Sequence, residues 1–523
     1  MDRRTLLAIA LSILVVVAYS AIMSRLYPPA PPSQETAEAP PEAAKGGPAE
    51  PSKGKGAAPQ AAPAPTAAAE AVAPVVAPSG REPTVVLKND RVTLTFGRRT
   101  AGLVSARLAR HTDEAGQPLE LVAEVARLHS GQVVGADGHV VAVERLERGP
   151  QQVAFVLEDG TRLTWRLPPG NYLAELTVEA ARPVRLVGPT GFSHRIERSR
   201  YYGNTGFAYG HGEKEERLPF KKLKADTTAT GPVAWVVSED KYFLQGWLPD
   251  HPFARVGFLV HPGAEADYTA LLTLPAAKAH LRVYVGAKEF DALKAADPVL
   301  AGRIHFGWFR VVAEPMFHLL RFLHRLTGSW GVAIILVTLL VKGLFFRLSH
   351  KQQVSMKRMQ ALQPEMQALR EKYKKDPQRM QREIMELYKR NKVNPMMGCL
   401  PMVVQIPVFL ALYNVLLNAI DLRHASFLYL KDLSAPDALF GHVAGFAIGP
   451  LPLVMGVSMW LQQQMTPTTM DPTQARMMKF LPVVFTLMFL NFPSGLVLYW
   501  TVNNLLTIAQ QVIANREVEA EAA

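Results

Sequence analysis

The stretch Ile334-Ile-Leu-Val-Thr-Leu-Leu-Val-Lys-Gly-Leu-Phe-Phe346 decides the fold class of the C-terminal half of this chain. It is apolar enough for a transmembrane helix, yet it contains one cation, Lys342. On insertion scales, a charged side chain at the bilayer centre costs ~2.5–3.5 kcal/mol of free energy, so such a residue usually faces water or a partner. The alternative is that Lys342 snorkels, because the end of its span is only about six residues, or ~9 Å, away.

Further apolar stretches predict a membrane protein with several helical spans. Residues 480–513 are too long for one span, and Asn491-Phe-Pro-Ser-Gly495 signals a turn inside them. The apolar run Thr5–Met23 follows two arginines and lacks a small-residue cleavage site, so we expect an uncleaved anchor over residues 1–27. These stretches predict six spans: the anchor, Ser329–Leu348, Met397–Ile420, Val443–Leu461, Met478–Leu490 and Gly495–Ile513.

The distribution of charge predicts the topology. The loop Lys351–Lys392 holds twelve Lys/Arg and five Asp/Glu, and loops of this kind stay in the cytoplasm. Arg3 and Arg4 hold the N-terminus on the same side, which places residues 28–325 outside and returns the C-terminus to the cytoplasm. In a cell with two membranes, the chain is then a multi-pass inner-membrane protein whose residues 28–325 are periplasmic.

Between the anchor and the other spans, the composition predicts a linker and then a large soluble domain. Residues 28–81 are rich in Ala and Pro and poor in aromatic and large aliphatic residues, so we expect a disordered tether. Over residues 82–300, short alternating stretches such as Gln152-Val-Ala-Phe-Val-Leu157 predict antiparallel strands in a β-sandwich. The chain has one cysteine, Cys399, so no disulfide framework supports this domain.

We find no sequence pattern that indicates an enzyme, a cofactor or a metal site. His194, His211, Glu213 and Asp240 are scattered without metal-ligand spacing, and the chain contains neither a GxxxxGK[ST] phosphate loop nor a nucleophile motif. The net charge of +12 would suit either nucleic acid or an anionic membrane surface. Because basic residues cluster beside apolar spans, we expect lipid contacts and no DNA partner.

Residues 301–327 predict an amphipathic helix that lies in the membrane interface. Met316, Phe317, Leu320 and Leu323 alternate with basic residues at helical spacing, and Pro315 suits a first helical turn. The alternative is that this helix packs against the sandwich domain.

Residues 349–394 predict a cytoplasmic helical hairpin within a five-span core that covers residues 328–515. Methionine and leucine recur every three or four residues before and after a break at Lys374-Lys-Asp-Pro377. Either the two helices pack on each other, or the methionine-rich face accommodates passing hydrophobic segments. The basic face suits lipid headgroups or ribosomal RNA.

Polar side chains in the predicted spans are candidates to share a cavity with Lys342, because amides in a bilayer need partners. Thr338 lies four residues before Lys342 and therefore on the same helix face. The predicted core spans contain no Asp or Glu that would neutralise the lysine, which favours a hydrated groove over a proton or ion pump. The other candidates are Gln405, Asn414, Gln462, Thr501, Asn503 and Asn504.

Four motifs make the chain similar to a known family. They are Gly328-Ser-Trp-Gly331, Val393-Asn-Pro-Met-Met-Gly-Cys-Leu-Pro401, Gln405-Ile-Pro-Val-Phe-Leu-Ala-Leu-Tyr413 and Phe492-Pro-Ser-Gly-Leu-Val-Leu-Tyr499. In this order and at these spacings they are highly specific. The chain resembles the YidC family of membrane protein insertases in its Gram-negative form, over essentially its whole length.

The resemblance implies a periplasmic β-supersandwich and five core helices around a hydrophilic groove that is open to the cytoplasm and to lipid. The resemblance implies that the groove cation of the family corresponds to Lys342. It also implies that the hydrophobic path of the substrate corresponds to Thr338, Tyr499 and Trp500. With two of the polar residues above, the predicted substrate-binding set is Lys342, Thr338, Gln405, Tyr499, Trp500 and Asn503.

The chain departs from the family pattern at two positions. The usual groove arginine is Lys342 here, and Arg347 stands where a proline is common. Lysine keeps the charge of arginine but loses its bidentate fork.

The implied function is that of a non-enzymatic insertase and chaperone, which inserts and helps fold nascent inner-membrane proteins alone or with the Sec translocon. Lys342 would attract acidic residues of the substrate while a hydrophobic segment partitions into lipid. The expected partners are nascent membrane proteins, the Sec translocon, membrane lipids and, transiently, the ribosome, although the tail 516–523 is short and acidic. The alternatives are a small-solute transporter, which would predict an inverted repeat that we do not find, and an envelope enzyme acting through the sandwich domain.

Overall fold

The computed structural model describes residues 82–522, apart from residue 114 and the segments 123–125, 193–204, 213, 262–266, 392, 394–399 and 466–471. The predicted anchor over residues 1–27 and the predicted linker over residues 28–81 lie outside the described residues, as does Cys399.

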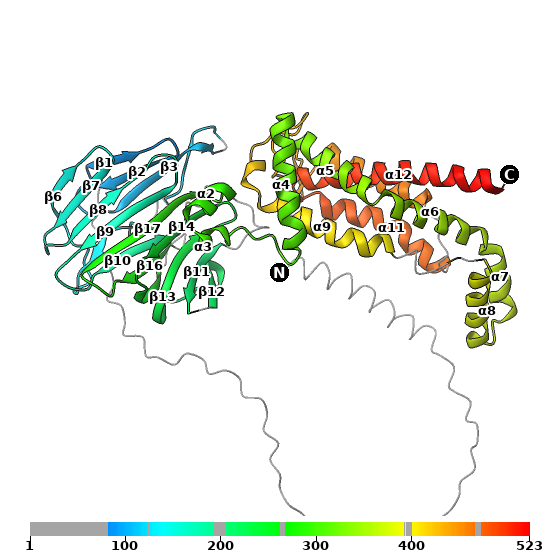
Figure 1. Cartoon of the computed structure of the whole chain (residues 1–523), viewed down its shortest axis with the longest axis horizontal. Coiled ribbons are helices and arrows are strands. Elements are labelled where there is room, and N and C mark those ends of the chain that lie inside the picture. Colours follow the sequence, from blue (N-terminus) through cyan, green and yellow to red (C-terminus); the bar gives the residue numbers. More distant parts are fainter. Residues whose placement is uncertain are drawn as a thin grey trace, which may run out of the picture. The chain divides into compact units, whose positions relative to one another are not determined.

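The first half of the described chain forms two antiparallel β-sheets (Figure 1). The smaller sheet has the strand order β1-β2-β3-β4, and the larger has the order β5-β10-β16-β15-β13-β14-β17-β9-β8-β7-β6, with β11 and β12 added beside β13. The strands of the smaller sheet are β1 (Thr84–Lys88), β2 (Val92–Gly97), β3 (Leu103–Thr112) and β4 (Pro118–Glu120). Those of the larger sheet are β5 (Val133–Val134), β6 (Val143–Arg148), β7 (Gln152–Leu157), β8 (Arg162–Arg166), β9 (Leu173–Glu179), β10 (Arg185–Thr190), β11 (Gly206–His211), β12 (Lys214–Pro219), β13 (Thr227–Glu239), β14 (Phe243–Pro249), β15 (Phe253–His261), β16 (Asp267–Thr273) and β17 (Lys278–Ala287).

Alternating apolar residues hold the two sheets together. In β9, every second side chain is buried, as the period-two pattern predicts. Phe96 of the small sheet contacts the rings of Phe155 and Trp165 on the large sheet, with ring centroids 6.0 and 5.1 Å apart. The predicted β-sandwich is therefore confirmed, and its core is aromatic and aliphatic rather than cross-linked.

Three helices follow the sandwich: α2 (Phe290–Ala296), α3 (Pro298–Ala301) and α4 (Arg310–Thr327). The apolar face of α4 is buried through Met316, Phe317, Leu320 and Leu323, and α4 packs on the later helices α5 and α9. Phe317 also contacts the ring of Phe290 in α2, at 5.5 Å between centroids. The predicted amphipathic helix is thus present, and its apolar face is covered by protein.

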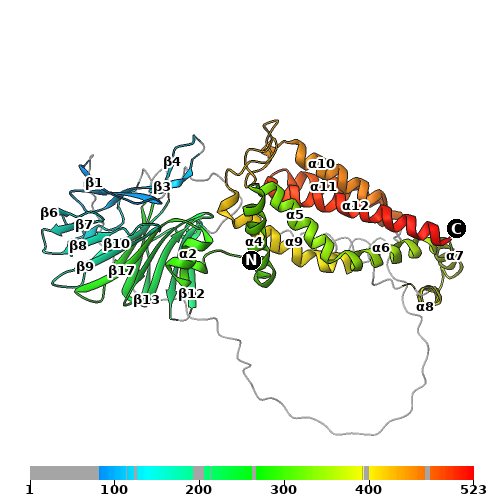
Figure 2. The same cartoon turned by 45° about the horizontal axis from the view of Figure 1, so that its top comes forward.

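The helical core is built around its last helix. Its members are α5 (Trp330–Leu344), α6 (Phe346–Ala361), α9 (Leu400–Asn418), α10 (Pro450–Met465), α11 (Pro472–Phe489) and α12 (Ser494–Ala522). Helix α12 packs against α5, α6, α9 and α10, and α10 also packs against α11 (Figure 2). Short 3-10 turns occur at Phe220–Lys222 and Ile420–Leu422.

Several predicted span limits differ from the helices of the structure. Helix α11 begins at Pro472 instead of Met478, and α12 continues past Ile513 to Ala522. The predicted span Ser329–Leu348 is interrupted at Phe345, where α5 and α6 meet at a bend of 65°. The predicted span Val443–Leu461 begins instead at Pro450, because β18 (His442–Val443) pairs with β19 (Phe446–Ala447) in a small hairpin. Among the described residues, only the bent pair α5–α6 reaches the length and apolarity of a membrane span, and no unbroken helix does.

The loop between α6 and α9 forms the predicted helical hairpin, with helices α7 (Gln363–Lys372) and α8 (Pro377–Arg390). Part of its apolar face turns inward: Met359, Leu362 and Met366 are buried in one cluster with Leu387 and Tyr388, whereas Met385 is 43% exposed. The Tyr388 hydroxyl lies 3.1 Å from the Met366 sulfur. The described residues therefore favour self-packing over an open methionine face.

One carboxylate joins α2 to the sandwich. Glu289, the residue before α2, accepts hydrogen bonds from Tyr172 (2.7 Å) and pairs with Arg91 (2.7 Å) and His111 (2.9 Å). Burial opposes its ionisation, but the hydrogen bonds from His111 and Tyr172 and the charge of Arg91 outweigh burial and lower the pKa of the Glu289 carboxyl to about 2.

We predict that Glu289→Gln destabilises the sandwich by about 1–2 kcal/mol at neutral pH. A carboxyl with a lowered folded-state pKa stabilises the fold above its unfolded pKa near ~4.3, and this contribution is lost as the pH falls toward 2. Unfolding of the full chain in detergent, followed from pH 7 to pH 3, should show the difference between wild type and variant shrinking. Glu144→Gln, at an exposed position, should change little; an equal deficit of Glu289→Gln at both pH values would contradict the prediction.

Candidate functional site

The cation Lys342 reaches across to the central helix. It lies in the last turn of α5, and its Nζ donates a hydrogen bond to Thr507 Oγ1 of α12 at 2.8 Å. Thr507 Oγ1 in turn donates to the carbonyl oxygen of Asn503 at 2.7 Å. This chain of bonds directs the ammonium onto a neighbouring helix, which argues against the snorkelling alternative.

Lys342 has no carboxylate partner among the described residues: the ion pairs found there involve other cations. The side chain is only partly buried. An ammonium carries three N–H donors, and the bond to Thr507 uses one of them. The remaining donors can bind water or an acidic group that approaches the helices.

An aromatic surface lies on α12 near this cation. Trp500 precedes Asn503 and Thr507 by one and two turns, so the three side chains share one side of the helix. The Trp500 ring contacts Phe409 of α9 edge-on at 4.7 Å and Phe489 of α11 at 5.3 Å between centroids. Both Trp500 and Asn503 remain partly exposed, so a polar and an aromatic surface adjoin each other on α12.

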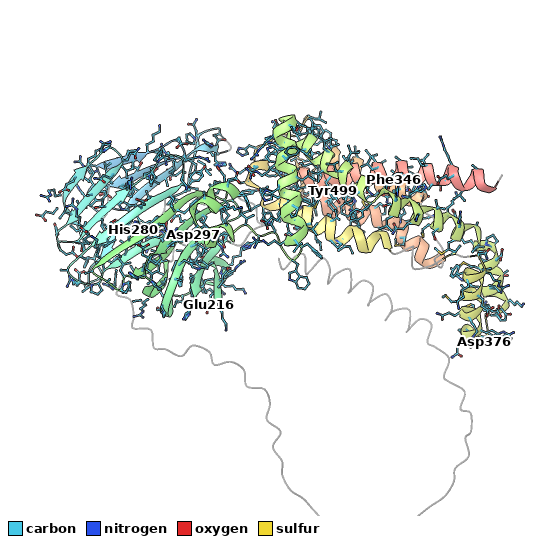
Figure 3. The ribbon with its side chains drawn as sticks, in the orientation of Figure 1. Glu216, His280, Asp297, Phe346, Asp376 and Tyr499 are labelled. Atoms are coloured by element: carbon cyan, nitrogen blue, oxygen red, sulfur yellow. The ribbon has the colours of Figure 1, made fainter. Side chains whose placement is uncertain are left out.

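A second polar contact joins α9 to α12. Gln405 Nε2 donates to the hydroxyl of Tyr499 at 2.7 Å. The side chain of Gln405 is partly exposed, whereas Tyr499 is 2% exposed and lies within the helical bundle (Figure 3). Thr338 is 1% exposed, and its hydroxyl bonds to the carbonyl oxygen of Ile334. Four of the six predicted residues thus reach the surface, and Thr338 and Tyr499 lie behind them.

The other predicted polar residues have partners elsewhere in the helical core. Asn504 Nδ2 donates to Ser458 Oγ of α10 at 3.0 Å, and both residues are buried. The side chains of Asn414 and Thr501 bond to carbonyl oxygens one turn earlier in their own helices. Gln462 has a partner as well. Asn504 therefore joins α12 to α10, whereas Asn414 and Thr501 are bonded within their own helices.

Sequence reasoning missed Thr507. Its spacing of four residues from Asn503 was the available signal, because it places both on the face that the polar residues of this helix share. The geometry offers a cation, hydroxyls and amides. In the part of the chain that the structure describes, no group of three or more His, Cys, Asp or Glu side chains is arranged to hold a metal ion.

The chain matches two protein-family models, "YidC periplasmic domain" over residues 84–319 and "60Kd inner membrane protein" over residues 322–521. It is 51% identical to the membrane protein insertase YidC of Pelobacter propionicus over 295 residues, which is 54% of each chain. It is 36% identical to that of Geotalea uraniireducens over 99% of this chain and 100% of the relative. A crystal structure described as an active YidC insertase with its first transmembrane domain resolved matches 84% of this chain and 94% of its own, with 21% identity and a TM-score of 0.38.

We predict that Gln405 and Tyr499 are energetically coupled. Tyr499→Phe leaves the Gln405 amide without its acceptor, and Gln405→Leu removes the donor, so each should lower stability by about 1–2 kcal/mol. The double variant should be less destabilised than the sum of both by about 1 kcal/mol. Denaturant unfolding of the purified chain in detergent measures this coupling. The control is Thr486→Val, which removes a hydroxyl that bonds within α11, and its effect on stability should add to that of Gln405→Leu. Additive effects of the Gln405 and Tyr499 variants would contradict the prediction.

Proposed function

Because this chain belongs to the YidC family of membrane protein insertases, we propose that its helical core inserts nascent inner-membrane proteins through a hydrophilic groove lined by Lys342, Gln405, Trp500 and Asn503. Thr338 and Tyr499 support this surface from behind. The observation that carries the proposal is the ammonium of Lys342, which is held by a hydroxyl and faces no carboxylate among the described residues.

We propose the six-span topology with both termini in the cytoplasm and residues 28–325 in the periplasm. Two sets of contacts at opposite ends of α12 support it. At its start, the backbone N–H groups of Ser494 and Gly495 donate to Ala435 and Leu433 in the loop after α9. Near its other end, Glu517 pairs with His350 of α6, which leads into the basic hairpin. The loop after α9 and the predicted cytoplasmic hairpin therefore meet different ends of one helix.

The proposed mechanism lowers the barrier to moving polar peptide through hydrocarbon. Unpaired backbone groups in lipid cost several kcal/mol each, so a wet path that reaches partway into the membrane shortens the unfavourable distance. The free donors of Lys342 attract acidic residues of the substrate into this path. The apolar segment of the substrate then moves past Trp500 into lipid, and its burial supplies the driving force.

The role is non-enzymatic in this proposal, and the partners follow from the same physics. The hairpin 349–394 carries a basic surface that suits the ribosome during synthesis or anionic headgroups. Cooperation with the Sec translocon remains a part of the proposal that the family membership supports. A small-solute transporter is not supported.

We predict that the charge at position 342 decides how well acidic segments are inserted. In vesicles, both the wild-type protein and the Lys342→Arg variant should insert a single-span substrate that has an acidic exported tail. Lys342→Glu should reduce this insertion about fivefold, which corresponds to ~1 kcal/mol of lost charge interaction. A substrate with a neutral tail of equal length should be affected less. Equal insertion of the acidic tail by the Arg and Glu variants would reject the role of the charge.

We also predict that Thr507 positions the ammonium of Lys342. Thr507→Val keeps the shape but removes the acceptor, so the ammonium keeps its charge but loses its fixed position. Insertion of the acidic tail should then fall about threefold, which corresponds to ~0.65 kcal/mol. Thr507→Ser should restore it. The control is Thr501→Val, because the Thr501 hydroxyl bonds to the carbonyl oxygen of Val497 in the same helix. A purely structural role would lower insertion of acidic and neutral tails equally, and that outcome would remove Thr507 from the proposal.

A further inference from the structure

A small hairpin after α9 exposes an unusual amount of apolar surface. The loop hairpin, residues 438–449, contains the paired strands β18 and β19, and its turn includes Ala444 and Gly445 with positive φ. Its large side chains point outward instead of into a core. The exposed fractions are 54% for Leu439, 65% for Phe440, 63% for Val443 and 41% for Phe446.

The loop hairpin carries no formal charge. Residues 438–449 include no Lys, Arg, Asp or Glu, and His442 is their one titratable side chain. Contiguous exposed apolar groups of this kind mark a surface that something covers. A protein partner that recognises such a surface normally also uses polar or charged groups at its rim to fix orientation. A bilayer needs no such groups.

Backbone hydrogen bonds in the loop hairpin are largely satisfied, which is the condition for entering lipid. The N–H of Phe440 donates to Ile448 O, and the N–H of Ile448 donates to Gly441 O, each at 2.9 Å. The N–H of Ala447 donates to the side chain of Asn491 at 3.0 Å. These backbone groups are thus paired within the protein, and the exposed side chains of the segment are apolar apart from His442.

The base of the loop hairpin is fixed to the ends of three apolar helices. Asn491, which it contacts, lies in the turn between α11 and α12. At the start of α10, the N–H of Leu451 donates to the buried carboxylate of Asp437 at 2.9 Å. Exposed apolar side chains continue from this base along the neighbouring helices: Leu453, Val454 and Val457 on α10, and Val484, Leu487 and Met488 on α11.

We propose that the loop hairpin dips into the outer leaflet of the bilayer, with Phe440 and Val443 among the lipid chains. The continuity of its apolar surface with the outward faces of α10 and α11 identifies lipid as the occupant. Inserted there, the loop hairpin fixes the depth of the outer ends of α10 and α11. This inference rests on the membrane placement proposed above.

The test places an environment-sensitive NBD dye on the loop hairpin of the full chain. Val443→Cys in a Cys399→Ser background is labelled and reconstituted in vesicles of phosphatidylethanolamine and phosphatidylglycerol. Emission should be blue-shifted, quenched by lipids with a shallow doxyl group and protected from aqueous iodide. Glu158→Cys, in the exposed turn after β7, is the matched control and should show the reverse. Phe440→Cys provides a second labelling position if the first variant fails to fold.

Two outcomes overturn the inference. Iodide quenching at Val443 equal to that at Glu158 would show that the loop hairpin stays in water. Protection from iodide without quenching by doxyl lipids would show that a protein, such as a second copy of the chain, covers it. Insertion of the acidic-tail substrate is measured in parallel with the labelled protein and with the unsubstituted chain. Intact insertion by the labelled protein with a water-exposed dye rejects only the inference about the loop hairpin. No insertion by the unsubstituted chain rejects the proposed function.

Discussion

An ammonium that has no carboxylate partner among the described residues constrains the helical core. Lys342 stands in an apolar helix, and an ammonium there is tolerated only where polar atoms or water replace its hydration shell. Thr507 supplies one such atom, and its own proton is committed to Asn503, so the hydroxyl presents a lone pair to the lysine. Helix α12, which packs against α5, α6, α9 and α10, brings this acceptor to the charge.

The polar residues of the core fall into two groups with different physical roles. Asn504 with Ser458, and Gln405 with Tyr499, join pairs of helices by hydrogen bonds that lipid cannot replace. Lys342 keeps donors that these contacts do not use. The hydrogen-bonded amide pairs hold helices together, whereas the ammonium of Lys342 has N–H donors left over. Those donors are available to a substrate.

Much of the fold was predictable, and the failures have local causes. Short alternating stretches identified strands such as β7, β8 and β9. In β8 and β9 every second side chain is buried, which leaves a direct trace in the sequence. Hydropathy alone misassigned residues 443–449 to a span, because an exposed apolar hairpin and a helix have similar composition; Gly441, Gly445 and Gly449 were the missed signal. The bond between Gln405 and Tyr499 joins residues 94 positions apart, so no local pattern reveals it.

The contact with Thr507 changes how a lysine compares with an arginine at position 342. A guanidinium is planar and can bind a carboxylate with two parallel donors, so it orients itself on its partner. An ammonium on a flexible stem has no such preferred plane and loses more rotamer freedom when a substrate fixes it. A hydroxyl acceptor on the neighbouring helix fixes the stem in advance, so part of that loss occurs during folding of the protein instead of during recognition of each substrate.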